Sequence, residues 1–189
     1  MRMEVSLAGL ERAIDRMKAT PQQLSRAEVR AIKKTIRGGK ATTAKLIREH
    51  YALKSAEIKS RISSKDPEAG QALTRGYLYF SDYAIPLELY GNPRQGKKGV
   101  SVTVEKGKGR QLFRHAFFRK DGKPGIWKRV PAGDGKLVAR TPIRRLWGPS
   151  LASIIRRDLI DQISADTGET LRKRYSEELN YELRELRAK

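Results

Sequence analysis

The clearest pattern in the chain is a stretch near its middle in which hydrophobic and polar residues alternate. Val100, Val102 and Val104 occupy every second position. The polar residues between and after them are Ser101, Thr103 and Glu105. Because successive side chains of a strand point to opposite faces, this spacing predicts a strand with a buried valine face and a polar face.

Further strand patterns surround the valine strand. A hydrophobic run precedes it at residues 85–90, and a Gly/Lys turn follows it at residues 106–109. A second run covers residues 111–118, and a third covers residues 126–130. Asp121-Gly122 between these two runs is a typical hairpin signal. Together the runs predict a small antiparallel sheet, strongly basic on its polar face.

The sheet region has three further parts. Leu73 and residues 76–80 are rich in leucine and aromatic residues and predict the first strand of the same sheet. Residues 91–99 contain three glycines, a proline and three cations, and we expect them to form a flexible basic loop. A glycine-rich loop at residues 132–136 leads to Leu137-Val138.

Helical spacing dominates the N-terminal third of the chain. Residues 6–17 predict a first short helix. Thr20-Pro21 is a helix start, and the helix that follows either ends at Gly38-Gly39 or carries these glycines inside a longer helix; we favour one helix to Tyr51. Ser55 then caps a short helix with Ile58 and Ile62 on its inner side, ended by residues 63–67.

The C-terminal residues also predict helices. Ser150 can cap a helix that begins at Leu151, and residues 166–169 break or re-cap it. The hydrophobic stripe of the last helix consists of Leu171, Tyr175, Leu179, Leu183 and Leu186. We therefore predict an α+β fold, a small antiparallel sheet packed against a long N-terminal helix and C-terminal helices. At 189 residues it is a single domain, with helices in 1–64, the basic sheet region in 72–140 and helices in 150–187.

The charge of the chain points to its partners. Forty-one Lys and Arg residues against 21 Asp and Glu give a formal net charge of +20. Such an excess implies an anionic partner or acidic neighbours, and the alternative is a merely basic, solvated surface. There is no cysteine. The sequence shows no secretory signal and no hydrophobic run long enough for a membrane span.

Cations are densest in two places. The predicted long helix carries a ladder that we expect on its outward face: Arg26, Arg30, Lys33, Lys34, Arg37, Lys40, Lys45 and Arg48. Only Glu28 and Glu49 are interleaved with them. In the sheet region, the candidate contacts to DNA or a partner are Arg94, Lys97, Lys98, Lys106, Lys108 and Arg110. Lysine and arginine attract phosphate without reading bases, so no sequence specificity is expected.

Aromatic residues lie among the sheet cations. Phe113, Phe117, Phe118 and Trp127 could stack on single-stranded bases, but core packing is their commoner role. Tyr90 and Trp147 are interpreted as packing anchors.

Signals for catalysis are weak. His50 and His115 lack metal-ligand spacing, and no phosphate-binding loop or nucleophile elbow is present. Four acids lie in or beside the predicted sheet, as a metal-dependent nuclease would need: Glu88, Glu105, Asp121 and Asp134. However, Glu105 and the adjacent Lys106 would point to opposite faces of a strand. We expect no enzyme activity, no cofactor and no metal site.

Several motifs resemble those of the minor tail protein Z family of lambdoid phages. They are LELYG at residues 87–91, GKKGVSVTVEKG at 96–107, WKRV at 127–130 and PIRRLWGPSL at 142–151. The family usually has Tyr where this chain has Trp147. The structural motif residues that this resemblance assigns are Gly99, Val100, Pro142, Ile143, Leu146, Trp147, Gly148 and Pro149.

The resemblance implies a structural virion protein that completes the tail and joins it to the head. It implies a place in the neck of the virion, after assembly in the host cytoplasm. The implied partners are the tail terminator, the head–tail connector and, through the basic loops, viral DNA. By analogy with ring-forming neck proteins we expect a hexamer. The alternatives are a stand-alone nonspecific nucleic-acid-binding module and, after it, a metal-dependent nuclease.

Overall fold

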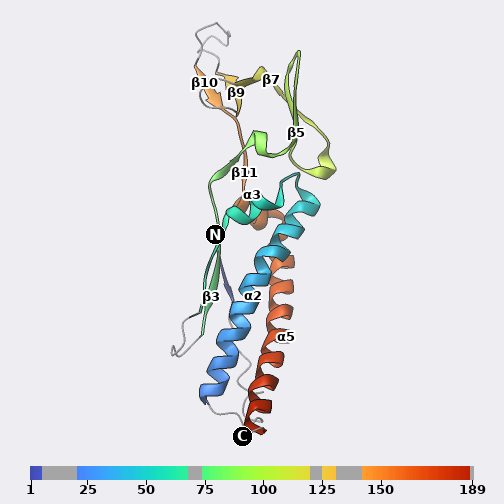
Figure 1. The fold of residues 1–189 in the computed structure, drawn as a ribbon. Helices are drawn as coiled ribbons and strands as arrows, with labels where there is room; N and C mark the ends of the chain where they lie inside the picture. The colour runs from blue at the N-terminus through green and yellow to red at the C-terminus, as the bar shows by residue number, and fades with distance from the viewer. Residues whose placement is uncertain (6–20, 68–73, 120–124, 131–141, 188–189) are drawn as a thin grey trace. The chain divides into compact units, whose positions relative to one another are not determined.

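The computed structural model describes residues 1–5, 21–67, 74–119, 125–130 and 142–187. The chain forms two compact units. The helical unit consists of residues 1–43, 59–81 and 157–189, and the strand unit consists of residues 44–58 and 82–156. Long helices and antiparallel strands together confirm the α+β fold class (Figure 1).

The long N-terminal helix is continuous, as predicted. Helix α2 (Pro21–His50) runs through Gly38-Gly39 without a break. A Cβ atom at Gly39 would lie 3.1 Å from Leu78 Cδ1, and one at Gly76 would lie 2.3 Å from Ile36 Cδ1. The glycines therefore let the helix and strand β3 (Gly76–Phe80) approach closely.

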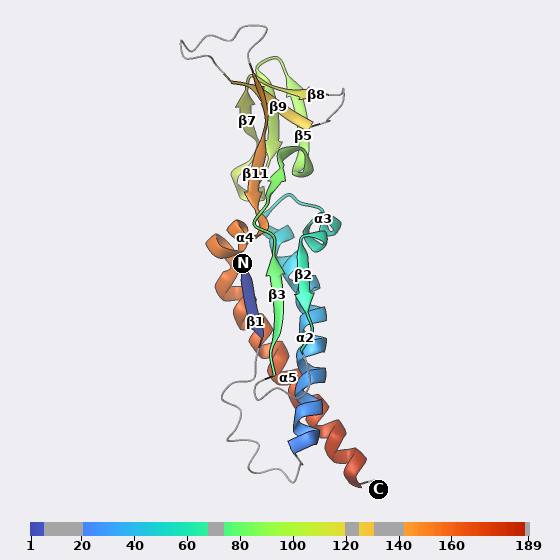
Figure 2. The ribbon, with the colours of Figure 1, turned by 90° about the vertical axis from the view of Figure 1, so that its left-hand side faces the viewer.

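Strand β3 lies in a different sheet from the one predicted. It is the central strand between β1 (Arg2–Val5) and β2 (Ile62–Lys65), antiparallel to both. These three strands run alongside α2 and α5 (Figure 2). The leucine and aromatic residues identified the strand correctly, but they hold no information about which distant segment pairs with it.

The segment before β2 also differs from the prediction. Helix α3 (Ser55–Ser60) ends before Ile62, which begins β2. Ile58 and Ile62 are both buried, as expected, although they lie on a helix and a strand and not on one helix.

The C-terminal helical region begins as predicted and then departs from the prediction. Helix α4 (Leu151–Ile154) is capped by Ser150, whose Oγ accepts a hydrogen bond of 3.1 Å from the Ser153 amide. A π-helical turn, η3 (Ile155–Leu159), leads into α5 (Ile160–Arg187). Helix α5 continues through residues 166–169, so the predicted break there is wrong. A Cβ atom at Gly168 would meet open space, so this glycine costs only its weak helix propensity, about 1 kcal/mol.

The predicted stripe of α5 packs inside the helical unit. Leu171, Tyr175 and Leu179 are buried, and Leu183 is half-buried. The side chain of Leu186 lies outside the described residues.

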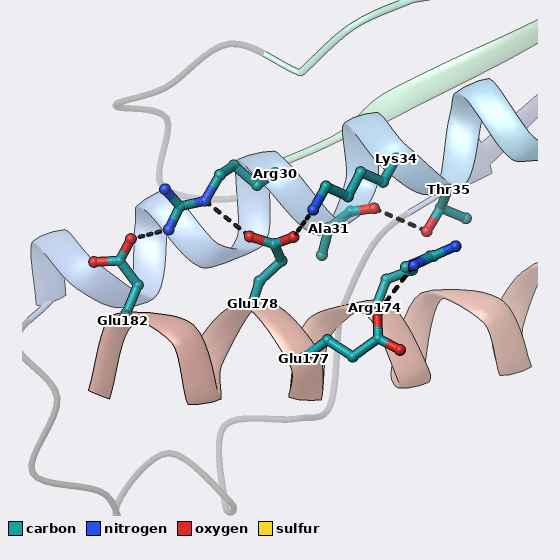
Figure 3. A network of polar contacts seen from close by, with 8 residues as sticks. All are labelled: Arg30, Ala31, Lys34, Thr35, Arg174, Glu177, Glu178 and Glu182. Atoms are coloured by element: carbon teal, nitrogen blue, oxygen red, sulfur yellow. Dashed lines mark hydrogen bonds and ion pairs between the residues drawn. The ribbon is translucent and has the colours of Figure 1, made fainter. Parts of the chain in front are cut away.

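Two buried carboxylates of α5 pair with cations of α2 (Figure 3). Glu178 and Glu182 are each only 6% exposed. Arg30 Nε lies 3.0 Å from Glu178 Oε2, and its Nη2 donates to Glu182; Lys34 Nζ donates to the other oxygen of Glu178. Both cations of the predicted outward ladder therefore pair with α5 while their side chains stay partly exposed, Arg30 at 38% and Lys34 at 55%. Lys33 pairs with Asp66 at 3.5 Å, while Arg26, Arg37, Lys45 and Arg48 are exposed.

The described residues of the strand unit form three small antiparallel sheets where one was predicted. The first has the order β5 (Gly91–Gly96), β6 (Gly99–Thr103) and β7 (Gln111–Arg114). The second has the order β10 (Ile143–Arg145), β9 (Gly125–Arg129) and β8 (Ala116–Arg119), and the third pairs β11 (Trp147–Ser150) with β4 (Ala84–Pro86). Short 3₁₀ turns η1 (Leu87–Leu89) and η2 (Lys106–Lys108) complete the unit. Val100, Val102 and Val104 are buried, which confirms the predicted valine face.

A single residue divides the predicted second run between two sheets. His115 has a φ of +61°, a left-handed conformation that is uncommon for a residue with a side chain. Strand β7 before it pairs with β6, and β8 after it pairs with β9. The placement of His115 within a strand is therefore wrong.

Some sequence predictions fall outside the described residues. They are the helix at 6–17, the Thr20 cap, Leu73, the Asp121-Gly122 turn, the loop at 132–136 with Asp134, and Leu137-Val138. Within the described ranges, no helix combines the length and the hydrophobicity that crossing a bilayer requires.

The interhelical ion pairs generate a first prediction. Glu178→Gln keeps the shape of the side chain but removes the negative charge that faces Arg30 and Lys34. Because both cations are partly exposed, water compensates in part, and we expect the free energy of unfolding to fall by about 1–3 kcal/mol in urea titrations. Glu177→Gln is the matched control, since Glu177 is exposed and pairs, among the described residues, with Arg174 alone. A loss in the control equal to that of Glu178→Gln would contradict the role of the buried pair.

Tyr175 generates a prediction about pH. The side chain is 2% exposed, and its hydroxyl has no hydrogen-bond partner among the described residues. Burial, and secondarily the nearby Glu28 carboxylate, raises the pKa of the Tyr175 hydroxyl above its ordinary value of 10.0. The folded state therefore favours the protonated hydroxyl. This contribution to stability is complete below pH 10.0 and is lost as pH rises through the higher, folded-state pKa.

We therefore expect Tyr175→Phe to weaken the loss of stability above pH 10.0. At neutral pH the variant should be as stable as the parent or more stable by about 1 kcal/mol, because no unpaired hydroxyl is buried. Denaturant unfolding at a series of pH values measures both effects. Parallel pH profiles of the parent and the variant would contradict this assignment.

Candidate functional site

The segment expected to be a flexible loop is a β-hairpin. Residues 91–96 form strand β5, and Lys97-Lys98 is a two-residue turn into β6. The turn closes with Gly96 opposite Gly99. Gly99 has a φ of +144°, and a Cβ atom there would lie 2.1 Å from the Phe113 carbonyl oxygen. Glycine at this position therefore allows both the tight turn and the close approach of β7.

The six candidate contact residues fall into two groups. All six are exposed in the strand unit. Lys106 Nζ donates to the Arg48 carbonyl, Lys108 pairs with Glu105 at 2.8 Å, and Arg110 Nη2 donates to the carbonyls of Asn92 at 2.7 Å and Ser101 at 3.0 Å. These three cations are therefore engaged within their own unit.

The second group is available for a ligand. Within the described ranges, the side chains of Arg94, Lys97 and Lys98 make no ion pair or hydrogen bond. They lie on β5 and at the hairpin turn, which separates them from η2, the turn that carries Lys106 and Lys108.

An open hollow of about 440 Å³ lies beside the hairpin turn. It is lined by Gln95, Lys97, Lys98, Gly99, Arg114, His115 and Ala116. We call this site the hairpin hollow. Sequence analysis missed Arg114 and His115 as members of the site. The signal that could have found them is the β6–β7 pairing, which sets Arg114 opposite Gly99.

Backbone hydrogen bonds hold the PIRRLWGPSL motif (residues 142–151) within the strand unit. The Leu146 amide donates to the Ile126 carbonyl at 2.8 Å, and the Leu146 carbonyl accepts from the Leu87 amide at 3.2 Å. A Cβ atom at Gly148 would lie 2.5 Å from the Tyr90 ring, whose hydroxyl donates to the Pro149 carbonyl at 2.8 Å. Tyr90 is therefore the packing anchor that was predicted.

The first two motif residues are held by the backbone of β9 and the residue after it. Pro142 is exposed, and its carbonyl accepts from the Val130 amide at 2.8 Å, while Ile143 pairs with Arg129 across β10 and β9.

Trp147 is not the packing anchor that was predicted. It is 52% exposed, and the Arg145 guanidinium lies over its ring at 5.1 Å. The Arg145 guanidinium also pairs with Glu88. Trp147 therefore stacks on a neighbouring cation at the surface of the strand unit.

The aromatic residues of the second and third runs are half-buried and do not lie in the core. Arg119 lies over Trp127 at 5.4 Å, and Arg129 lies over Phe117 at 5.7 Å. Phe113 and Phe118 are also half-buried. Phe117 and Trp127 on the β8–β9 sheet each carry an arginine guanidinium over the ring.

The acids considered for a nuclease are placed as follows. Glu88 pairs with Arg145, and Glu105 pairs with Lys108. Asp121 and Asp134 lie outside the described residues. In the part of the chain that the structure describes, no three His, Cys, Asp or Glu side chains gather as metal ligands. His50 is the exposed last residue of α2.

Fold and surface together define a strongly basic α+β protein whose β5–β6 hairpin carries the exposed cations Arg94, Lys97 and Lys98. Residues 7–189 match the family model described as Prophage minor tail protein Z (GPZ). The chain therefore belongs to the prophage minor tail protein Z family, as the motif resemblance predicted. It is a phage minor tail protein, a component of the virion whose partners include other phage tail proteins. No curated protein and no solved structure matches the chain.

The tight turn at Gly99 generates a prediction. Gly99→Ala places a Cβ atom against the Phe113 carbonyl and forces alanine into a left-handed φ, so β7 must separate from β6. We expect the free energy of unfolding to fall by roughly 3 kcal/mol, measured by urea titration. Gly96→Ala is the control on the other side of the turn, where the nearest contact is an ordinary 3.7 Å. It should leave stability unchanged, and equal losses for the two variants would refute the explanation.

Proposed function

We propose that this minor tail protein completes the tail and joins it to the head as a hexameric ring in the neck of the virion. The ring docks at the tail end, and its β5–β6 hairpins contact the terminal DNA or the acidic head–tail connector. The protein acts as a structural component and not as an enzyme, and it functions as one domain over residues 1–189. The observation that carries the proposal is that Arg94, Lys97 and Lys98 are exposed and unengaged in a chain of this family.

The distribution of charge supports an anionic partner. Glu178 and Glu182 are buried against cations of α2, and Glu88 and Glu105 are paired within the strand unit. These acids do not offset the hairpin cations. In a hexamer each copy adds a formal charge of +20, and physiological salt screens charges only beyond about 8 Å. Stable assembly of the ring therefore requires acidic neighbours or DNA.

Native mass measurement of the purified protein, alone and with tails that end in the tail-terminator protein, tests the proposal. We expect a hexamer on the tail end, with assembly favoured at high salt or by an acidic partner because both weaken repulsion between copies. A protein that stays monomeric under every one of these conditions would refute the ring and the proposed mode of tail completion.

The second candidate is a stand-alone nonspecific nucleic-acid-binding module, which the same unengaged hairpin cations favour. A duplex titration at several salt concentrations gives a steep negative log–log slope for such a module. Normal tail-to-head joining by particles that lack the protein would favour this candidate over the neck ring. Incubating the same duplex with magnesium or manganese tests the nuclease alternative through cleavage.

A further inference from the structure

We propose that the hairpin hollow is a binding site for a phosphate group of the DNA backbone. The side chains that line it include two ammonium groups, Lys97 and Lys98, one guanidinium, Arg114, and one imidazole, His115. None of its lining residues is acidic. The inference rests on the proposed neck function and names the ligand that the hairpin would take there.

The walls of the hollow are fixed by the backbone. The His115 amide donates to the Lys98 carbonyl at 3.1 Å, which ties the β7–β8 junction to the hairpin turn. Gly99 is paired with Arg114 across β6 and β7. The left-handed conformation of His115 turns the chain from one sheet into the next at this point. Cations from two separate turns are therefore held at one site before any ligand arrives.

Gln95 closes one side of the hollow and is already engaged. Its Oε1 accepts from the Phe118 amide at 3.0 Å, and its Nε2 lies 3.4 Å from the Ala116 carbonyl as donor. The amide thereby links β5 to β8. Contacts to a ligand then come from the four basic side chains, which make no ion pair or hydrogen bond among the described residues.

The chemistry of the lining favours phosphate over a base. Lysine and arginine side chains offer only donors, whereas reading a base edge requires donors and acceptors in a set pattern. No Phe, Tyr or Trp is among the described residues that line the hollow, so it lacks the large aromatic rings on which bases commonly stack. A phosphodiester presents anionic oxygen on several sides, which suits donors that approach from two turns. Binding is therefore independent of sequence.

The test is titration of a short fluorescent DNA duplex with the full-length protein at several salt concentrations. We expect the double variant Lys97→Gln/Lys98→Gln to bind at least about tenfold more weakly at moderate salt, and its log–log salt slope to become shallower by about 1–2 units. Arg114→Gln should lower the slope by about 1 unit. His115→Asn, which tolerates the left-handed backbone, should weaken binding with its fold retained.

The matched control is Lys106→Gln/Lys108→Gln, which also removes two positive charges from a turn of the strand unit. Both control lysines are exposed but contact Arg48 and Glu105 and not the hollow. We expect the control to keep the parent slope and to lose less than about twofold in affinity. Far-ultraviolet circular dichroism of every variant shows that differences in binding are not differences in folding.

Three outcomes would overturn the inference. One is a wild-type protein that does not bind the duplex even at low salt, and another is equal losses in the hollow variants and the control. The third is a pair of hollow variants that bind DNA normally but no longer bind the acidic connector, which would assign the hollow to a protein carboxylate. The neck function has a separate readout, because ring formation on tails is measured without DNA. A ring that forms while the hollow variants bind DNA normally refutes only the phosphate site.

Discussion

The helical unit depends on the neutralisation of two carboxylates that α5 carries into its interior. An unpaired buried carboxylate is costly, and replacing or removing one partner of such a pair costs more than the pair itself contributes. Arg30 and Lys34 of α2 supply the opposite charge to Glu178 and Glu182. These ion pairs place two acidic residues inside the helical unit. Because two cations pair with these two acids, the net charge of +20 is unchanged by the contact.

In the strand unit, close packing depends on glycines that let neighbouring groups approach the backbone. Gly99 and Gly148 each leave room for a neighbour that a side chain would displace, the Phe113 carbonyl and the Tyr90 ring. Both glycines belong to the motifs that resemble the family. Lys97 and Lys98, two of the cations proposed to meet a ligand, lie within the motif at residues 96–107.

Local features of the fold could be predicted from the sequence. The length of α2, the burial of the valine face and the Ser150 cap each depend on residues a few positions apart. The partners of β3 could not, because β1 pairs with it across more than seventy residues, as Arg2 with Tyr79. Glu182 lies 152 positions from Arg30, so the sequence placed Arg30 on an outward ladder. The loop at 91–99 was misread because its glycines favour both a flexible loop and a tight hairpin.

The candidate site was identified in part. Arg94, Lys97 and Lys98 were identified by their charge. Charge alone could not separate them from Lys106, Lys108 and Arg110. The partners of these three cations are carbonyl oxygens and one acid, which only the fold brings near. Arg114 and His115 joined the site through the β6–β7 pairing and the left-handed conformation of His115, neither of which the hydrophobic pattern of residues 111–118 reveals. Their contact with DNA or a protein partner stays a prediction.

The glycine at position 76 has a consequence for the whole three-stranded sheet. The Ile36 side chain of α2 occupies the space that a Cβ atom at Gly76 would need. The absence of that one methyl group therefore sets the spacing between the helix layer and the strand layer. Strand β3 is hydrogen-bonded on both edges, so the distance of β3 from α2 also sets the distance of β1 and β2 from that helix. A single larger residue there would lift the complete sheet and loosen every side chain packed beneath it.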